Sequence, residues 1–339
     1  MSANLPAAYG FPVVGHSGLL TGRGQHLGIV GFGGSIREDQ FQAQAPGKVQ
    51  TAPPQAITRV DPGFAAEIRM DLEIVLACAP EAQVTVYAFD ATEEGWIAGL
   101  RGLLDNDAPP SVLSVSWGWP ETGAGEPFWT TAGVEASEAL LAELAGRRVT
   151  VVACTGDAGA AICYPGSSAW VLACGGTEFC GPEERVWAMT GYASGGGMSS
   201  VIPMPAWQAR AGIRCEGVPT LAEHSHRCVP DVAASAVVSS PVVGGAHAGT
   251  SAAAPLWAGL ISLCNERRAQ MGRPPVGPVN APLYDRSTGL QAACHEIRVG
   301  NNSTTGGPPY YRSSPGWNAC GGWGSPKAAE WVEAIARMP

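Results

Sequence analysis

Short apolar runs alternate with helical patterns along most of the chain. Apolar runs of strand length, bounded by turn residues, predict strands at Leu27–Phe32, Val84–Phe89, Val112–Ser116, Val149–Ala153 and Val171–Ala173. Apolar residues at helical spacing predict helices at Pro62–Ala79, Glu94–Leu104, Val134–Gly146, Ala252–Arg268 and Lys327–Arg337. This alternation predicts an α/β fold with a mostly parallel central sheet flanked by helices. No repeat or linker divides the 339 residues, so we expect a single domain over residues 1–339.

One long segment could be mistaken for a membrane span. Residues 232–265 contain no Asp, Glu, Lys or Arg, but SSP, GG and GTS interrupt the apolar sequence with turn residues. We therefore predict a buried strand, a turn and a buried helix, and no membrane partner. The N-terminal SANLPAAYGF has neither a basic start nor an apolar run, so no signal peptide is expected.

Composition excludes two further classes of protein. Hydrophobic residues make up 45% of the chain, which is enough for a core and excludes intrinsic disorder. The net charge is −9, from 20 basic and 29 acidic residues. Lys48 and Lys327 are the only lysines, so the sequence has no basic stripe for a phosphate backbone. Nucleic acid is therefore not an expected partner.

The ten cysteines show no paired metal-binding spacing. Four lie in apolar runs and are predicted to be buried free thiols: Cys78, Cys154, Cys174 and Cys264. The other six lie in predicted loops and could pair, for instance as Cys163/Cys180, Cys215/Cys228 and Cys294/Cys320. The sequence leaves this open.

Several common enzyme motifs are absent. GFGGSI lacks the third glycine of a dinucleotide fingerprint, and Gly47-Lys48 is followed by Val rather than Ser or Thr. The sequence contains neither a G-x-S-x-G elbow nor an H-E-x-x-H motif. These absences disfavour a dinucleotide-binding enzyme, an α/β-hydrolase and a zincin.

Two carboxylates share one face of the predicted helix Pro62–Ala79. Asp61 is a plausible N-cap and Pro62 suits the first helical position. Glu67 and Asp71 are four residues apart, and the same stripe continues into apolar residues, which predicts a buried face. Burial and the like charge would raise at least one pKa of this pair. Two solvated helix acids would show the same spacing.

Two turns carry the other candidate groups. GTSAAAP brings Ser251 to the start of an apolar helix, where the helix dipole favours developing negative charge; an ordinary N-cap serine is the alternative. TGDAGA follows a predicted strand and presents Asp157 at its carboxyl end, where catalytic groups gather in α/β sheets. An aspartate that only stabilises its own turn is equally compatible.

Together these pieces resemble the sedolisin family of serine-carboxyl peptidases, which have a subtilisin-like fold. The resemblance extends from about Tyr9 to Pro326 and includes, in the family's order, the E-x-x-x-D helix, SVLSVSWGWPE, TGDAGA, YPGSSAWVLACGGT, SGGGMSSVIPMPAWQ, VPDVAA and GTSAAAP. It implies that Ser251 is the nucleophile and Glu67 its general base and acid. Asp71 would orient Glu67 and share its proton, and Asp157 would donate to the oxyanion.

The resemblance also implies a substrate cleft and a calcium site. Trp117, Gly118, Ser194, Gly195 and Gly196 match segments that line the cleft, although Trp117 could equally be a core aromatic. A structural calcium ion would take oxygen ligands from Glu296, Ile297, Ser314, Gly316 and Asn318. Asn318 stands where the family has an aspartate, and the loss of a carboxylate weakens a site for a hard cation.

A further departure lies at the first predicted strand. Many relatives carry a glutamate that extends the carboxyl network, and this chain has Gly31 at that position. The family's prosegment is not visible, because the motifs begin almost at Met1. Secretion is implied by the family alone.

The expected function is hydrolysis of peptide bonds by an acid-acting endopeptidase, through an acyl-enzyme on Ser251. A carboxylate base must be ionised while a carboxyl oxyanion donor must be protonated, and both conditions are met only in acid. A tripeptidyl aminopeptidase and a catalytically silent peptide-binding protein of the same fold are the alternatives. The expected partner is a peptide or polypeptide substrate, and we expect a monomer.

Overall fold

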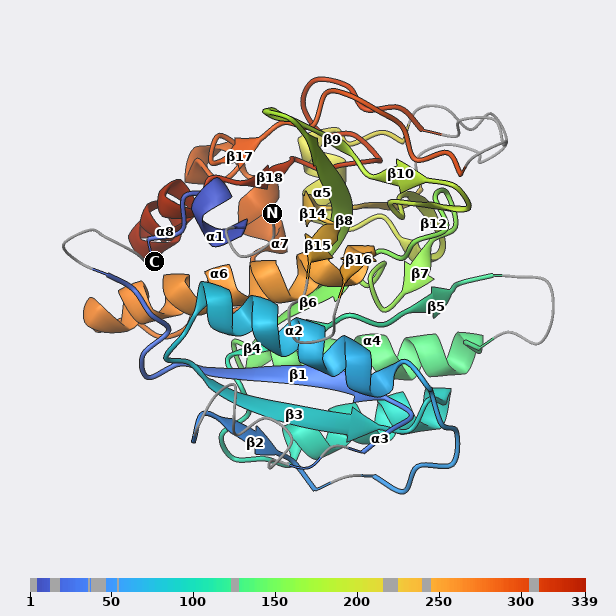
Figure 1. The fold of residues 1–339 in the computed structure, drawn as a ribbon, viewed down its shortest axis with the longest axis vertical. Helices are drawn as coiled ribbons and strands as arrows, with labels where there is room; N and C mark the ends of the chain where they lie inside the picture. The colour runs from blue at the N-terminus through green and yellow to red at the C-terminus, as the bar shows by residue number, and fades with distance from the viewer. Residues whose placement is uncertain are drawn as a thin grey trace.

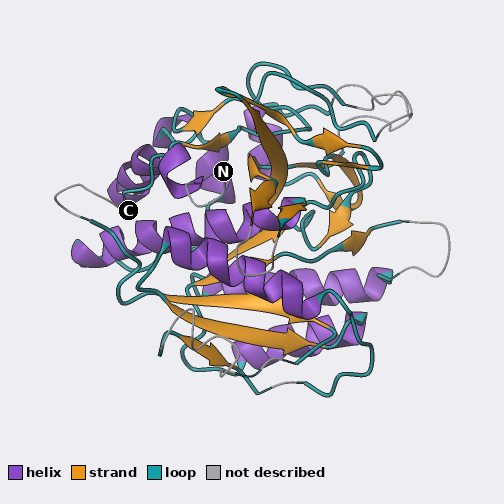
Figure 2. Ribbon diagram, in the orientation of Figure 1, coloured by secondary structure: helices purple, strands orange, loops and turns teal. Residues whose placement is uncertain are grey.

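A mostly parallel β-sheet with helices on both faces forms the centre of the protein (Figures 1 and 2). The computed structural model describes residues 5–12, 19–35, 37, 47–53, 55–122, 128–215, 225–239, 245–304 and 311–339. Its helices are α1 (Leu5–Ala8), α2 (Phe64–Cys78), α3 (Glu93–Leu104), α4 (Thr131–Gly146), α5 (Ala206–Ala211), α6 (Ala253–Gln270), α7 (Asn280–Tyr284) and α8 (Ala328–Arg337). The 3₁₀ turns η3 (Thr250–Ala252) and η4 (Arg286–Thr288) precede α6 and follow α7, respectively.

The central sheet has eight strands, ordered β14-β8-β6-β4-β1-β3-β2, with β9 paired to β8. They are β1 (His26–Phe32), β2 (Val49–Thr51), β3 (Gln83–Phe89), β4 (Val112–Val115), β6 (Thr150–Cys154), β8 (Val171–Cys180), β9 (Glu183–Val186) and β14 (Val232–Ser235). Every pairing is parallel except the β8–β9 pair. After β1 the chain forms β2 and β3 on one side of β1, and it then crosses to form β4 on the other side. The loops after β1 and β4 therefore lead in opposite directions along the sheet. Such a topological switch point, at the carboxyl ends of the strands, is where α/β sheets commonly place their binding and catalytic sites.

Shorter strands form five two-stranded ribbons outside this sheet. They are β5 (Trp119–Pro120) with β7 (Cys163–Tyr164), β10 (Ala188–Met189) with β11 (Tyr192–Ala193), β12 (Gly197–Pro203) with β13 (His226–Val229), β15 (Val237–Ser239) with β16 (Ala246–Ala248), and β17 (Cys294–His295) with β18 (Ser325–Pro326). The sequence did not predict these ribbons: most of their strands have two to four residues and resemble loops, and the seven-residue β12 lacks a continuous apolar run.

Alternating side chains of the strands fill two cores. In β1, Leu27 and Ile29 face the core that contains α2, α6 and α8, whereas Val30 and Phe32 face the core of α3 and α4. Figure 1 shows α2 and α6 crossing one face of the sheet and α3 and α4 lying against the other. A parallel sheet covered on both faces explains why its strands are almost continuously apolar.

Helix α6 runs through the interior with buried residues on all sides. A helix that is apolar all round belongs in a core, which accounts for the uncharged segment of the sequence. Its C-terminal end is fixed by Arg268, whose guanidinium donates to the carbonyl oxygens of Ile335, Met338 and Pro339 at 2.8–3.0 Å. The helix is therefore held at both ends, by the sheet edge and by the α8 region.

The predicted α/β fold is confirmed, with small shifts at element ends. The largest difference is at β8, which continues to Cys180, seven residues beyond the predicted end at Ala173. Helix α2 begins at Phe64, with Gly63 as its N-cap. Asp61 does not cap the helix and Pro62 does not begin it; the Asp61 carboxylate instead accepts a hydrogen bond from the Gly63 N–H at 2.7 Å. The buried strand and buried helix expected within residues 232–265 are present as β14 and α6, with the β15–β16 ribbon between them; residues 240–244 of the expected turn lie outside the described residues.

All ten cysteines are free thiols in this structure, and none of the three candidate pairs is linked. Cys78, Cys154, Cys174 and Cys264 are buried, as predicted. Among the described residues, no helix combines the length and the apolar character needed to cross a membrane.

Candidate active site

The candidate catalytic residues lie beside the carboxyl edge of the sheet. Asp157 follows β6 and Ser116 follows β4, so both occupy the strand ends where α/β sheets place functional groups. Ser251 lies in η3, directly before α6. Glu67 and Asp71 are one turn apart near the start of α2, which packs against both η3 and α6.

Ser251 is paired with a carboxyl group rather than with an imidazole. Its hydroxyl donates a hydrogen bond to Glu67. Burial raises the pKa of Glu67, and the negative charges of Asp157 and Asp61 raise it further, whereas the hydrogen bond from Ser251 opposes the rise. Glu67 therefore has the position and the proton affinity of a general base for the Ser251 hydroxyl.

Asp71 supports Glu67 from the interior. It is fully buried, and its Oδ1 accepts a hydrogen bond from the Ser116 hydroxyl at 2.7 Å. The same hydroxyl lies 3.0 Å from the backbone carbonyl oxygen of Ser251, so its one proton can serve either acceptor. Burial raises the pKa of Asp71 well above its usual range, and the nearby Glu67 charge adds to this effect. The two coupled carboxyls therefore retain a shared proton more readily than isolated ones.

Asp157 is held by the residue next to Ser251, the candidate nucleophile. Its Oδ1 accepts hydrogen bonds from both the N–H and the hydroxyl of Thr250, each at 2.8 Å. The Thr250 hydroxyl in turn accepts the N–H of Gly156 at 3.0 Å. Burial raises the pKa of Asp157, whereas the two bonds from Thr250 oppose the rise. With Oδ1 fixed in this way, Oδ2 is left for another partner.

Gly249 provides the space in which this second oxygen approaches the Ser251 hydroxyl. A Cβ atom on Gly249 would lie 2.8 Å from Asp157 Oδ2 and 3.2 Å from Ser251 Oγ, closer than real Cβ contacts usually come. Its φ of 172° is extended backbone, so the glycine is required by the close approach and not by its conformation. Asp157 Oδ2 and Ser251 Oγ therefore flank one small space, the arrangement needed by an oxyanion donor.

The segment Ser194–Gly196 supports the Asp157 turn from behind. The Gly195 N–H donates to the carbonyl oxygen of Gly156 at 2.7 Å, and the Gly196 N–H donates to that of Gly159 at 3.1 Å. The hydroxyl of Ser194 accepts the Gly176 N–H at 2.9 Å, and all three residues are buried. Their backbone N–H groups already have partners within the protein, and the substrate contact expected of these three residues stays a prediction.

Trp117 and Gly118 lie just after β4 and are partly exposed. The Trp117 ring packs edge-on against Phe32, with 6.0 Å between ring centroids. Its indole Nε1 is buried and has no hydrogen-bond partner within the described part of the chain. Trp117 is therefore in part a core aromatic, and the substrate contact expected of both residues stays a prediction.

The structure gives a reason for the glycine at position 31. A Cβ on Gly31 would lie 2.6 Å from the side chains of both Phe64 and Ile68 in α2. These apolar side chains fill the space that a larger residue at position 31 would need. The carboxyl network consequently ends at Glu67 and Asp71 on this side.

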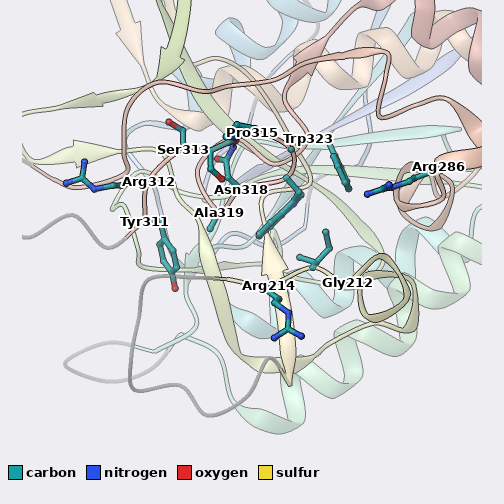
Figure 3. Close-up of a pocket in the computed structure, with 14 residues that line it drawn as sticks. Gly212, Arg214, Arg286, Tyr311, Arg312, Ser313, Pro315, Asn318, Ala319 and Trp323 are labelled. Atoms are coloured by element: carbon teal, nitrogen blue, oxygen red, sulfur yellow. The ribbon is translucent and has the colours of Figure 1, made fainter.

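The five predicted calcium ligands come together in a different region. Ser314, Gly316 and Asn318 line a cavity of about 750 Å³ that none of the catalytic candidates lines (Figure 3). The Glu296 carboxylate is ion-paired with Arg298 at 2.8 Å, and the Asn318 amide donates to the carbonyl oxygens of Ile297 and Ser314. Within the described residues, no cluster of three or more His, Cys, Asp or Glu side chains could hold a metal ion. The residues present do not fit a calcium ion.

Sequence reasoning missed two residues of the site, Ser116 and Thr250. Both are hydroxyl residues adjacent to a recognised motif position, and each holds one of the candidate carboxyls through a side-chain hydrogen bond. Their position next to Trp117 and Ser251 was visible in the sequence. The carboxyl that each one meets is distant in the chain and emerged only from the fold.

No protein-family model matches the chain. The chain is 32% identical to kumamolisin from Bacillus sp. (strain MN-32) in an alignment of length 354 that covers 93% of this chain and 61% of that relative. It is 31% identical to human (Homo sapiens) tripeptidyl-peptidase 1 over 288 residues, which cover 77% of this chain and 50% of that relative. The chain belongs to the sedolisin family.

Solved structures agree with this membership at the level of the fold. Pseudomonas sedolisin, a serine-carboxyl proteinase complexed with two molecules of pseudo-iodotyrostatin, superposes with a TM-score of 0.77 at 24% identity over 97% of both chains. The maturation protease PagA superposes with a TM-score of 0.55 at 16% identity, over 92% of this chain and 93% of that chain. This sedolisin chain spans only about half to three-fifths of the length of the curated relatives named above.

Proposed function

We propose that this sedolisin is an acid-acting serine-carboxyl endopeptidase that cleaves peptide bonds through an acyl-enzyme on Ser251. The observation that carries the proposal is the hydrogen bond from the Ser251 hydroxyl to the buried carboxyl of Glu67. A serine hydroxyl is a weak nucleophile unless an adjacent base takes its proton as it attacks. No histidine is needed for that step when a carboxyl of raised pKa lies in hydrogen-bonding contact.

In the acylation half of the reaction, Ser251 Oγ attacks the peptide carbonyl carbon as Glu67 takes the hydroxyl proton. Asp71 shares the additional proton with Glu67, which lowers the cost of protonating a buried base. Glu67 then gives the proton to the departing amine. Water repeats the sequence in reverse to release the acid product, with Glu67 again as the base.

The developing oxyanion would take a hydrogen bond from protonated Asp157 Oδ2 and a second from the backbone N–H of Ser251. Protonated Asp157 is available only below the pKa of this residue, which burial has raised. The pair of Glu67 and Asp71 can accept a proton only while it holds no more than one. These two requirements predict a bell-shaped pH profile in the acid range, with limbs shifted upward by burial.

The test is hydrolysis of an internally quenched peptide between pH 3 and 8. We expect Ser251→Ala and Glu67→Ala to abolish cleavage and Asp157→Ala to reduce it by about 10²–10³, each with a native circular dichroism spectrum retained. A folded Glu67→Ala protein with full activity would falsify the role of this base. A folded wild-type chain that cleaves no peptide and reacts with no peptide aldehyde would favour the silent peptide-binding alternative.

Tripeptidyl aminopeptidase activity is the second candidate, supported by the similarity to tripeptidyl-peptidase 1. Matched peptides with free and acetylated N-termini separate the two modes. An endopeptidase cleaves both peptides, whereas a tripeptidyl peptidase needs the free amine and releases residues in threes. We further propose that the chain acts as a secreted monomer.

A further inference from the structure

A neutral side chain, Asn318, bridges the loop that resembles a calcium site, and the Glu296 carboxylate adds a hydrogen bond from the Gly316 backbone. Asn318 is 4% exposed and lies at the cavity shown in Figure 3, close to Ser313 and Pro315. Its Nδ2 donates to the carbonyl oxygens of Ile297 and Ser314, at 3.1 and 2.9 Å. These are two of the oxygens that a calcium ion would need.

The other end of the same amide is fixed by the backbone. Asn318 Oδ1 accepts the N–H groups of Cys320 and Gly321, at 3.1 and 2.9 Å. An amide has two N–H donors and one oxygen with two lone pairs, so all four are used. Turning the amide over would set NH₂ against two N–H groups and oxygen against two carbonyls. The backbone therefore directs the positive end of the side chain toward the carbonyl oxygens.

The remaining charges around the loop disfavour a cation as well. The Glu296 carboxylate is already paired with Arg298, whose Nε and Nη2 lie 2.9 and 2.8 Å from its Oε2. The residues that line the cavity include Arg214, Arg286 and Arg312, and none of these lining residues is acidic. Calcium prefers six to eight oxygen ligands with several carboxylates among them. The loop provides no free carboxylate.

We propose that the Asn318 amide takes the place of a calcium ion in this chain, so that the loop is closed without a metal. The two N–H donors of Asn318 bridge the carbonyls of Ile297 and Ser314, as a cation would, but carry no net charge. The amide thereby joins the residue 296–298 segment to the 314–318 loop, beside the bond from the Gly316 N–H to Glu296. Loop closure should then be independent of calcium concentration.

The test compares thermal unfolding of the wild-type chain in excess EDTA with unfolding in millimolar calcium chloride. We expect the same Tm in both, and no binding heat when calcium is titrated into the protein. Neither readout depends on peptidase activity, so a failure of the proposed function would leave this test intact. A lower Tm in EDTA, or saturable calcium binding that Asn318→Ala abolishes, would overturn the proposal.

Asn318→Asp supplies the complementary arm. The new carboxylate would face two carbonyl oxygens, so we expect a lower Tm in EDTA and recovery of that Tm when calcium is added. Asn302→Asp is the matched control, because Asn302 is also buried and bridges backbone groups, donating to Gly196 O at 3.1 Å and accepting from Tyr311 N at 3.2 Å. This control should lose stability without any calcium response.

A folded Asn318→Asp protein that shows no calcium response would count against the idea that the amide replaces an ion. The same holds if calcium rescues Asn302→Asp equally well, because the response would then not belong to this loop. If Asn318→Asp does not fold under either condition, the wild-type comparison in EDTA and calcium decides the question alone.

Discussion

Asp157→Asn offers a sharp test of the proposed oxyanion donor, because it keeps the shape of the side chain and removes its titration. In the native chain, Thr250 donates to Asp157 Oδ1 through both its N–H and its hydroxyl. An asparagine at this position must keep its oxygen toward those donors, which directs its NH₂ to the place of Oδ2. The variant would therefore present an N–H donor beside Ser251 Oγ at every pH.

The expected changes in rate follow from the protonated and ionised states of the native Asp157 carboxyl. Loss of one oxyanion donor costs about 10²–10³ in rate, so Asp157→Ala should fall by that factor at the acid optimum. Asp157→Asn retains a donor and should stay within about tenfold of the wild type there. Above the pKa of Asp157, wild-type activity should fall about tenfold for each pH unit, whereas the variant should not follow this fall. The two profiles should therefore cross.

The assay is kcat/KM for a quenched peptide measured at half-unit steps of pH on wild type, Asp157→Asn and Asp157→Ala. An alkaline limb in Asp157→Asn that coincides with that of the wild type would refute the assignment, since that limb would then belong to another group.

Thr250→Val adds an internal check. A hydrogen bond to an ionised acceptor is stronger by about 1 kcal/mol than one to a neutral acceptor, so its loss should move the limb up by about 0.7 pH unit. Thr250→Ser keeps the hydroxyl and should leave the limb unchanged.

Three further predictions concern the carboxyl pair and its surroundings. Ser116→Ala should lower kcat more than it raises KM and should move the acid limb of the kcat profile to higher pH, because Asp71 loses the hydrogen bond that favours its ionised form. Ser116→Thr should restore the wild-type pH profile. An unchanged profile in Ser116→Ala would contradict the role of Ser116 in tuning the Asp71 pKa. Because the pKa of Asp71 is raised on folding, the folded state binds more protons than the unfolded one, and ionisation of Asp71 lowers the free energy of unfolding as pH rises from about 4 through the folded pKa. Asp71→Asn should therefore raise Tm near neutral pH more than at pH 4. Equal Tm shifts at both pH values would argue against this coupling. Gly31→Glu should lower Tm and should not rebuild a longer carboxyl network, since its Cβ would meet Phe64 and Ile68 at 2.6 Å; a variant as stable as wild type would show that this packing adjusts easily.

The α/β fold was predictable because the sheet is buried on both faces. Strands such as β1 and β3 must then be apolar at nearly every position, and this pattern stands out in any sequence. Helix ends were less certain. The Asp61-Pro62 pair has the chemistry of a helix start, but the chain uses it for a turn that donates the Gly63 N–H to Asp61. Local propensity is compatible with both outcomes, and in the structure the Phe64 side chain packs against Gly31 and Gly34 at the start of α2.

The candidate site was predictable where a motif places a carboxyl or hydroxyl next to a strand or helix end. It was not predictable where the function of a residue depends on a distant partner. Thr250 is 93 residues from Asp157 in the chain, and Ser116 is 45 residues from Asp71. The interactions of Asn318 could not be predicted for the same reason, because a calcium site and a network of amide hydrogen bonds are both compatible with the sequence of this loop. Only the positions of the Cys320 and Gly321 N–H groups show which way the amide faces.

The anchoring of α6 also has a consequence for the time at which the site can form during synthesis. Arg268 reaches carbonyl oxygens of Ile335, Met338 and Pro339, which lie 67 to 71 residues later in the chain. The helix that begins beside Ser251 therefore gains its far-end support only after the α8 region has left the ribosome. A nascent chain shorter than this has its nucleophile residue but not the anchored helix behind it. The support at the C-terminal end of α6 is therefore among the last contacts that the growing chain can make.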